Sequence, residues 1–386
     1  MRQIEYIGYN STEKIIHIIE KENIKKPFLV ISESAFKGSK LEEIIRGLLK
    51  VGKIEGIYIF SDFENNPKYE DIIKGLELFK KNRHDVIISY GGGSSIDVSK
   101  LIKYFSCIDN KNNREGNLLQ IKGENYNRAM QKDIIHIAIP TTCGSGAEAT
   151  KFAVMYYQNK KYSVEHQALL PKYVIIDPYV FMKLPDKILA SSIMDSLAQG
   201  IESYWSINST EESQVYSKKC IGLVMQNYLK AFEERDINSL YNLSKASNFS
   251  GKAINIAKTT APHAMSYVLT NKYNIPHGQA VMMILPYVYE FNAEMEGELK
   301  EKRGKDYLRK VFEELNSLLN ITSSKEIKEK LINMMTALNL ETKLSEITPE
   351  EINVEELVNS INLERLNNNP LKINKTEIET IYNCII

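Results

Sequence analysis

A short apolar stretch, "IMDSLAQGIESYWS" (193–206), carries three polar side chains that could do chemistry: Asp195, Gln199 and Glu202. Asp195 and Gln199 are four residues apart, so a helix projects them from one face. A carboxylate among apolar neighbours is costly to bury unless a partner compensates its charge. The stretch therefore raises the hypothesis of half a metal site, with Gln199 where a metal-binding helix usually carries histidine.

Two of the six histidines stand at the start of apolar helical patterns. His263 follows Pro262 in "TTAPHAMSYVL", and His277 lies between proline and glycine in "YNIPHGQAVMMILP". Both side chains could be satisfied core histidines. Together with Asp195, however, they make a set of one carboxylate and two imidazoles, which suits a divalent zinc or iron ion with an open position for substrate.

Three of the other four histidines have simpler interpretations. We expect structural or surface roles for those in an amphipathic helix, a polar turn and a strand, namely His17, His84 and His136.

A glycine-rich turn in "VIISYGGGSSIDVSK" (86–100) follows a buried strand and precedes a helix that we expect to begin near Ile96. Glycines let the backbone approach a phosphate closely, and a helix N-terminus presents unpaired N–H groups. A plain strand–turn–helix connection needs one glycine at most, so the pattern favours a dinucleotide pyrophosphate site, although it is not the usual GxGxxG fingerprint. The candidate residues are Gly91, Gly92, Gly93, Ser94 and Ser95.

A second loop, "IPTTCGSGAEAT" (139–150), also leaves the end of a buried strand. It offers the hydroxyls of Thr141 and Thr142 and the flexibility of two glycines. Strand C-termini converge in open α/β sheets, so we expect both loops to contact one nucleotide.

The elements that must position these residues fall into two classes. Apolar, β-branched segments at 28–32, 54–61, 85–90 and 134–140 alternate with helical patterns, which predicts a doubly wound parallel α/β sheet. Segments 152–157 and 161–166 read as a hairpin. From about residue 189 onward the periodicity is helical. We therefore predict an α/β dinucleotide-binding domain over 1–188 and an all-helical metal- and substrate-binding domain over 189–386, with the cleft between them as the default site.

Composition limits the classes of partner. The 386 residues carry no formal net charge, with 49 basic and 49 acidic side chains, which argues against nucleic acid or an anionic membrane. The four cysteines form no CxxC pair, and neither a signal-peptide core nor a membrane-length apolar run is present. We expect a cytoplasmic protein, acting on a small molecule and assembling as a homodimer.

Six ordered motifs resemble those of the iron-containing (group III) alcohol dehydrogenases, over nearly the whole chain. They are "GGGSSIDVSK", "PTTCGSGAEAT", "IIDP", "MDSLAQGIESY", "HAMSYVL" and "IPHGQAVMMILPYVYEFN". The resemblance implies a Rossmann-like N-terminal domain that binds NAD(P)H, a helical C-terminal domain that holds Fe²⁺ or Zn²⁺, and catalysis between them. This is also the architecture of 3-dehydroquinate synthase.

Three of the family's four metal ligands match Asp195, His263 and His277, and the fourth, normally histidine, is Gln199. Gln199 could bind the metal through its carbonyl oxygen, hydrogen-bond a metal-bound water or contact substrate. Where the family usually has a further active-site histidine, this chain has Tyr267, a candidate for proton relay or for packing. Because of these departures, the sequence indicates a preference for iron over zinc less clearly than that of a typical family member does.

The departures are similar to the branch of phosphonoacetaldehyde reductases, which make 2-hydroxyethylphosphonate. A phosphonate needs cationic or N–H donors near the aldehyde site. By residue type alone the candidates are Lys151, His166, Arg365 and Lys372, each of which could equally be a surface or structural residue.

Cofactor preference depends on the end of the strand in "FLVISES". Our alignment places Ser32 where NAD-specific enzymes offer an acid to the ribose, and a small serine leaves room for the 2′-phosphate of NADPH. A shift of one residue would place Glu33 there and favour NADH. The resemblance adds Asp97 and Lys161 to the cofactor-binding residues.

Three other functions compete with this one. A general alcohol or lactaldehyde reductase of the same family would act on uncharged substrates. A 3-dehydroquinate synthase is a lyase with an acidic, lysine-rich site, whereas the motifs here follow the dehydrogenase pattern. A nucleotide-binding protein that has lost catalysis would explain Gln199 and Tyr267 but not the retention of the other three metal-site residues.

Overall fold

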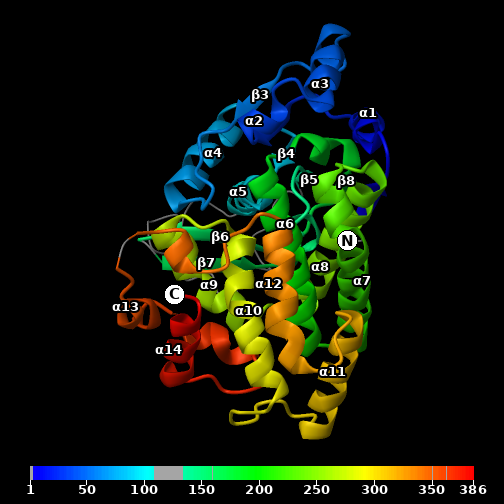
Figure 1. The fold of residues 1–386 in the computed structure, drawn as a ribbon. Coiled ribbons are helices and arrows are strands. Elements are labelled where there is room, and N and C mark those ends of the chain that lie inside the picture. Colours follow the sequence, from blue (N-terminus) through cyan, green and yellow to red (C-terminus); the bar gives the residue numbers. More distant parts are fainter. Residues whose placement is uncertain (1–2, 108–133, 159, 350, 362) are drawn as a thin grey trace. The chain divides into compact units, whose positions relative to one another are not determined.

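Six short strands in the first half of the chain form one parallel sheet (Figure 1). The computed structural model describes residues 3–386 except 108–133, 159, 350 and 362. The strand order is β1-β8-β5-β4-β2-β3. The bounds are β1 Ile4–Ile7, β2 Pro27–Ile31, β3 Tyr58–Phe60, β4 Val86–Gly91, β5 Ile135–Pro140 and β8 Tyr173–Ile176.

Helices cover both faces of this sheet, and this explains why its central strands are buried almost continuously and are mostly apolar. Phe28 and Val30 of β2 pack with the cluster that includes Leu76 and Leu101, whereas Leu29 and Ile31 point to the opposite cluster. The helices are α1 Lys14–Lys21, α2 Glu33–Phe36, α3 Lys40–Lys50, α4 Tyr69–Lys81 and α5 Gly93–Ser106. The predicted doubly wound parallel sheet is confirmed.

The predicted hairpin is present as β6 Phe152–Tyr157 and β7 Lys160–Glu165, which pair antiparallel. Strand β1 was not predicted. Its four residues lie at an edge of the sheet and are all half-buried, so they lack the buried apolar run that marks the central strands.

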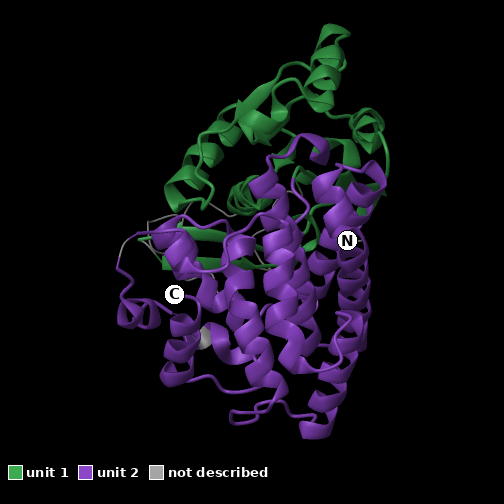
Figure 2. Cartoon of the chain, in the orientation of Figure 1, with its two compact units in different colours: residues 1–141, 147–180 green, residues 142–146, 181–386 purple. Residues whose placement is uncertain are grey.

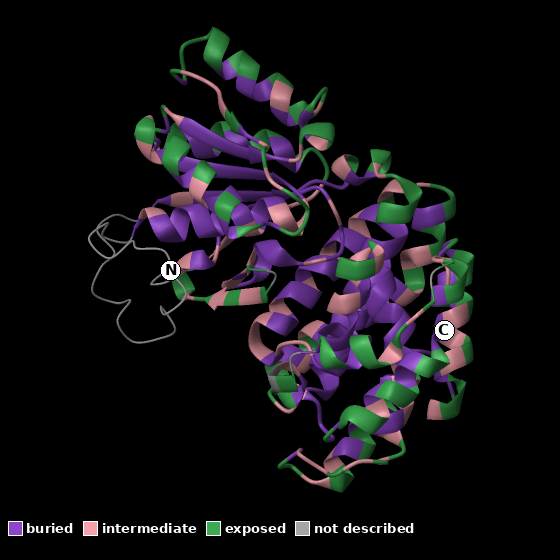
Figure 3. Cartoon of the chain, turned by 90° about the vertical axis from the view of Figure 1, so that its left-hand side faces the viewer, coloured by how far each residue is buried: buried purple, intermediate pink, exposed green. Residues whose placement is uncertain are grey.

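Helices make up the rest of the described chain, where no strand is assigned after β8. They are α6 Asp186–Trp205, α7 Glu211–Glu233, α8 Ile237–Ala257, α9 Ala261–Tyr273, α10 His277–Ala293, α11 Lys305–Leu318, α12 Ile327–Ala337, α13 Val354–Asn359 and α14 Lys375–Cys384. Helix α6 is buried along almost its whole length, and α7, α8 and α10 pack around it. Figure 3 shows the contrast between buried and exposed helix faces.

The contacts group the chain into two units (Figure 2). Unit 1 comprises residues 1–141 and 147–180, and unit 2 comprises 142–146 and 181–386. The predicted domain division at residue 188 stays a prediction. Among the residues that the structure covers, no helix is long and apolar enough to cross a membrane.

Candidate metal centre and cofactor-binding loop

Helix α6 carries Asp195 into the interior of unit 2, where its side chain meets His263 from the first turn of α9. Both residues are buried, with 6% and 4% of their surfaces exposed. Asp195 Oδ1 and His263 Nε2 lie 3.3 Å apart, and neither atom has a well-aligned hydrogen-bond partner among the described residues. Leaving two buried polar atoms unsatisfied is costly, so their arrangement points to a missing partner.

His277, the first residue of α10, completes a cluster with these two. One ligand atom from each of Asp195, His263 and His277 lies within 4.8 Å of the others. Unlike the other two, His277 is only partly buried. A divalent cation would satisfy both unpaired atoms, and carboxylate plus imidazole ligands suit zinc or ferrous iron. The residues present therefore fit the metal that the sequence led us to expect.

The charged groups of the cluster shift the pKa values of one another. Burial alone would lower the pKa of His263, but the Glu202 and Asp195 carboxylates outweigh burial and raise it to about 9. Burial alone would raise the pKa of Asp195, but the close contact with His263 and the charge of His277 outweigh it, so this pKa is lowered. Without an ion, the site thus favours an ionised Asp195 beside a protonated His263; a bound metal would keep the carboxylate and take the place of the proton on His263 Nε2.

Glu202 lies on the far side of the His263 ring, two helical turns after Asp195. Its Oε1 contacts His263 Nδ1, and its Oε2 accepts hydrogen bonds from Thr260 N at 2.6 Å and Thr260 Oγ1 at 2.8 Å. Trp205 Nε1 donates to the same threonine hydroxyl at 2.8 Å. A carboxylate bonded to one ring nitrogen orients the other nitrogen, as is usual for metal-binding histidines. The sequence singles out Glu202 as a polar side chain in an apolar helix but indicates no role for it.

Gln199 faces both Asp195 and α8. Its Oε1 accepts a hydrogen bond from Ser250 Oγ at 2.8 Å, and a hydrogen bond from its side chain helps to lower the pKa of Asp195. In this arrangement the amide supports the carboxylate. The hydrogen bond from Ser250 uses one lone pair of the Gln199 carbonyl oxygen and leaves the second for a metal. Metal ligation by Gln199 stays a prediction.

Tyr267 lies one helical turn after His263 and stacks on His277. The two rings are parallel within 3°, with centroids 5.7 Å apart. The guanidinium carbon of Arg365, from the 3₁₀ turn Leu363–Asn368, lies 5.1 Å from the centre of the Tyr267 ring. The structure thus assembles a tyrosine and an arginine on the partly exposed side of the cluster.

In unit 1, the glycine-rich turn joins β4 directly to α5. The helix begins at Gly93, so the prediction of a start near Ile96 is wrong by three residues. The reason is that Gly92 already serves as the N-cap, with its carbonyl accepting from Ile96 N. The first-turn N–H groups therefore belong to Gly93, Ser94 and Ser95, and such groups lack partners within the helix.

A side chain at position 91 would close this turn, because its Cβ would lie 2.0 Å from Ser95 Oγ. The same Cβ would lie 3.3 Å from Ser32 Cβ, so Ser32 at the end of β2 adjoins the turn. Thr141 N donates to the Gly91 carbonyl at 2.9 Å. The strand ends thus bring together three of the predicted cofactor-binding positions: Ser32, Gly91 and Thr141.

The other residues predicted to bind the cofactor make different contacts. Asp97 accepts a hydrogen bond from Val154 N at 2.9 Å and so ties α5 to β6. Lys161 lies on β7 opposite Tyr156, and Thr142 opens the segment that groups with unit 2. The hydroxyl of Ser94 donates to the Asn65 carbonyl. Binding of a dinucleotide by all of these residues stays a prediction.

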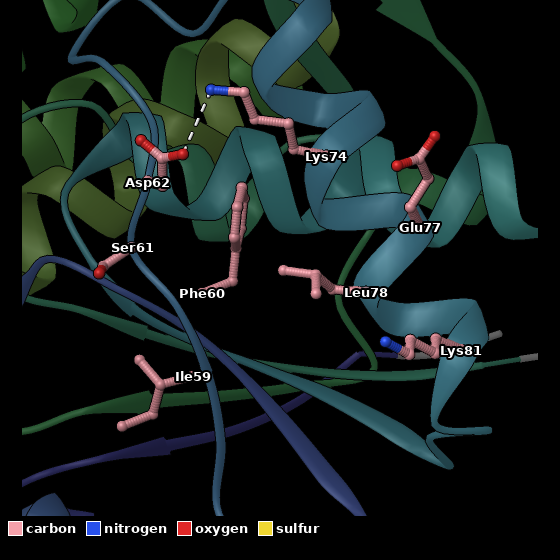
Figure 4. A pocket seen from close by; sticks show the side chains of 8 residues that line it. All are labelled: Ile59, Phe60, Ser61, Asp62, Lys74, Glu77, Leu78 and Lys81. Carbon is pink, nitrogen blue, oxygen red and sulfur yellow. Dashed lines mark hydrogen bonds and ion pairs between the residues drawn. The ribbon is translucent and has the colours of Figure 1, made fainter.

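A pocket lies beside β3 and α4 (Figure 4), and none of the candidate residues lines it. It is lined by Ile59, Phe60, Ser61, Asp62, Lys74, Glu77, Leu78 and Lys81. Lys74 pairs with Asp62 across it at 3.2 Å. Nothing in its lining repeats the chemistry of the metal cluster.

Family models cover both halves of the chain. Residues 4–178 match the model described as iron-containing alcohol dehydrogenase, and residues 189–386 match the C-terminal model of the Fe-containing alcohol dehydrogenase family.

Proteins with similar sequences are also named as alcohol dehydrogenases. The NADPH-dependent butanol dehydrogenase of Clostridium saccharobutylicum is 26% identical over 391 aligned residues, covering 98% of this chain and 95% of the relative. Aldehyde-alcohol dehydrogenase 2 of Entamoeba histolytica is 28% identical over 290 residues, which are 72% of this chain. That match spans only 33% of the Entamoeba protein.

Solved structures share the fold. The sulfoacetaldehyde reductase of Bifidobacterium kashiwanohense, solved in complex with NAD⁺, has a TM-score of 0.82 at 24% identity, covering 99% of this chain and 96% of that one. The alcohol dehydrogenase of Oenococcus oeni has a TM-score of 0.85 at 21% identity, covering 100% and 99%. With both halves matched in order by its models, the chain belongs to the iron-containing alcohol dehydrogenase family.

Proposed function

We propose that this chain is a metal-dependent, NAD(P)H-linked reductase of a small aldehyde, most specifically of phosphonoacetaldehyde to 2-hydroxyethylphosphonate. The observation that carries the proposal is the buried pair of unsatisfied atoms, Asp195 Oδ1 and His263 Nε2, with His277 beside them. A redox-inert nucleotide-binding protein would have no reason to keep this costly arrangement.

The residues have separate tasks in the proposed reaction. Asp195, His263 and His277 hold a divalent ion, which supplies Lewis acidity for the carbonyl oxygen of the substrate. The turn after β4 binds the cofactor pyrophosphate through the first-turn N–H groups of α5. Tyr267 is the candidate for passing a proton to the alcohol oxygen, either directly or through water. Ser32 leaves room for a 2′-phosphate, which favours NADPH.

Support for an anionic aldehyde comes from the similarity in fold to a sulfoacetaldehyde reductase. Sulfonate and phosphonate are both tetrahedral oxyanions on a two-carbon aldehyde. A second candidate function, reduction of uncharged short-chain aldehydes, is favoured by the similarity to butanol and 1-propanol dehydrogenases.

The experiment that separates the two measures cofactor oxidation by the metal-reconstituted protein with phosphonoacetaldehyde, sulfoacetaldehyde, lactaldehyde, propanal and butanal. We expect kcat/KM for phosphonoacetaldehyde to exceed that for propanal by about tenfold or more, a difference of one charge-assisted hydrogen bond. Equal kcat/KM for the uncharged aldehydes would contradict the specific proposal and leave the second candidate. The same assay with NADPH and NADH measures the cofactor preference.

A further inference from the structure

The residues of the metal cluster and their neighbours differ in burial. Asp195 and His263 are buried, and Glu202, which is fully buried, closes the far side of the His263 ring. His277 and Tyr267 are only partly buried. The partly exposed side of the cluster is therefore the side where His277 and Tyr267 lie.

A permanent positive charge lies on that side. The Arg365 guanidinium lies over the Tyr267 ring, and the Tyr267 ring lies parallel to the His277 ring. Arginine stacks well on aromatic faces, and the stack restricts a side chain that would otherwise be flexible. The cation thus adjoins a ring that stacks on a predicted metal ligand.

The other three cations named from the sequence are engaged elsewhere. Lys151 pairs with Glu165 at 3.2 Å, and Lys372 pairs with Glu298 at 3.1 Å with 63% of its side chain exposed. His166 caps a 3₁₀ turn by accepting from Ala168 N. Burial lowers the pKa of His166, which favours the neutral ring. Arg365, by contrast, contacts Tyr267, which stacks on His277 of the metal cluster.

We propose that Arg365, held against Tyr267, binds the anionic group of the substrate while the aldehyde end faces the residues of the metal cluster. This inference rests on the proposed function and assigns its specificity to one residue. A guanidinium is always charged and offers two parallel N–H donors to a tetrahedral oxyanion, so it selects phosphonate or sulfonate over a methyl group.

The test compares Arg365→Gln, Arg365→Lys and a matched control, Arg309→Gln, which removes an exposed arginine paired with Asp306 on α11. We expect Arg365→Gln to reduce the ratio of kcat/KM for phosphonoacetaldehyde to that for propanal by about 10- to 100-fold. The ratio for Arg365→Lys should lie between those for Arg365→Gln and the unmodified protein, because lysine keeps the charge but lacks the two parallel N–H donors. Arg309→Gln should leave the ratio unchanged. An unchanged ratio in Arg365→Gln overturns the inference.

A second measurement does not depend on turnover. Ethylphosphonate, an unreactive phosphonate anion, is titrated calorimetrically into the metal-loaded proteins. We expect Arg365→Gln to weaken binding by about tenfold or more, and Tyr267→Leu to weaken it through loss of the stacking surface, whereas Tyr267→Phe keeps the ring and the affinity. Equal affinity in all variants overturns the inference.

The two measurements also separate this inference from the proposed function. If the unmodified protein reduces no aldehyde, and Arg365→Gln nevertheless weakens ethylphosphonate binding, then the proposed reaction fails and the anion site stands. If it reduces phosphonoacetaldehyde and Arg365→Gln changes neither readout, then the inference alone fails.

Discussion

Asp195 and the two histidines can be singled out from the sequence because their types and local settings are unusual. An acid in an apolar helix and two histidines at helix starts each need an explanation, and a metal supplies one for all three. The support around them could not be predicted in the same way. Glu202 and Thr260 are far apart in the chain, and their hydrogen bonds appear only when α6 and α9 are placed.

The same limit applies to Gln199 and Arg365. The sequence left three roles open for Gln199, and the structure adds a fourth, because Ser250 of α8 fixes its carbonyl oxygen. Arg365 was one of four cations by type, and only its stack with Tyr267 distinguishes it.

Glu202→Gln tests the role of the carboxylate behind His263. The amide can still accept from Thr260, but it loses the charge that faces the ring nitrogen. We expect the dissociation constant for zinc, measured by competition with a chromophoric chelator, to rise by about 10- to 100-fold. Glu202→Asp should restore part of the affinity, and the exposed Glu212→Gln on α7 serves as the control. Unchanged zinc affinity in Glu202→Gln would show that the carboxylate has only a packing role.

At the scale of elements, close helix approaches position the site. Gly278 in the first turn of α10 lets that helix pack directly on α6, and its N–H donates to Ser191 Oγ at 3.1 Å. The segment 142–146 is held to α6 by Ser196 Oγ, which donates to the Cys143 carbonyl at 2.8 Å. The sequence predicts the helices from their periodicity, but it does not predict which helices cross or where a glycine is required.

Gly278→Ala tests this crossing. A Cβ there would lie 2.0 Å from the Ser191 carbonyl oxygen and 2.7 Å from Asp195 N, so α6 and α10 must move apart. We expect a loss of about 1–3 kcal/mol in the free energy of unfolding, measured by urea denaturation, together with weaker zinc binding.

The matched control is Gly222→Ala on α7, where a Cβ meets nothing within 4 Å. It should raise stability by about 0.5–1 kcal/mol, as alanine does for glycine within a helix. If both variants behaved alike, the close packing of α10 on α6 would not be what orders the metal cluster.

At the scale of the whole molecule, composition and alternation were enough to predict a parallel α/β half followed by a helical half. The central strands are recognisable because helices bury both of their faces, and β1 is not because it lies half-buried at an edge. Sequence could not predict that Thr142–Gly146 would group with the helices, since this follows from contacts such as that of Gly146 with Gly251. The family models match both halves in order, so the chain contains both parts of the iron-containing alcohol dehydrogenase family.

The most direct test of the account measures bound metal and NADPH-dependent aldehyde reduction in parallel for Asp195→Ala, His263→Ala and His277→Ala. The exposed His17→Ala serves as the control. We expect each of the three variants to lose bound iron or zinc and reductase activity together, and His17→Ala to retain both. Full reductase activity in the unmodified protein after complete removal of metal would contradict the account.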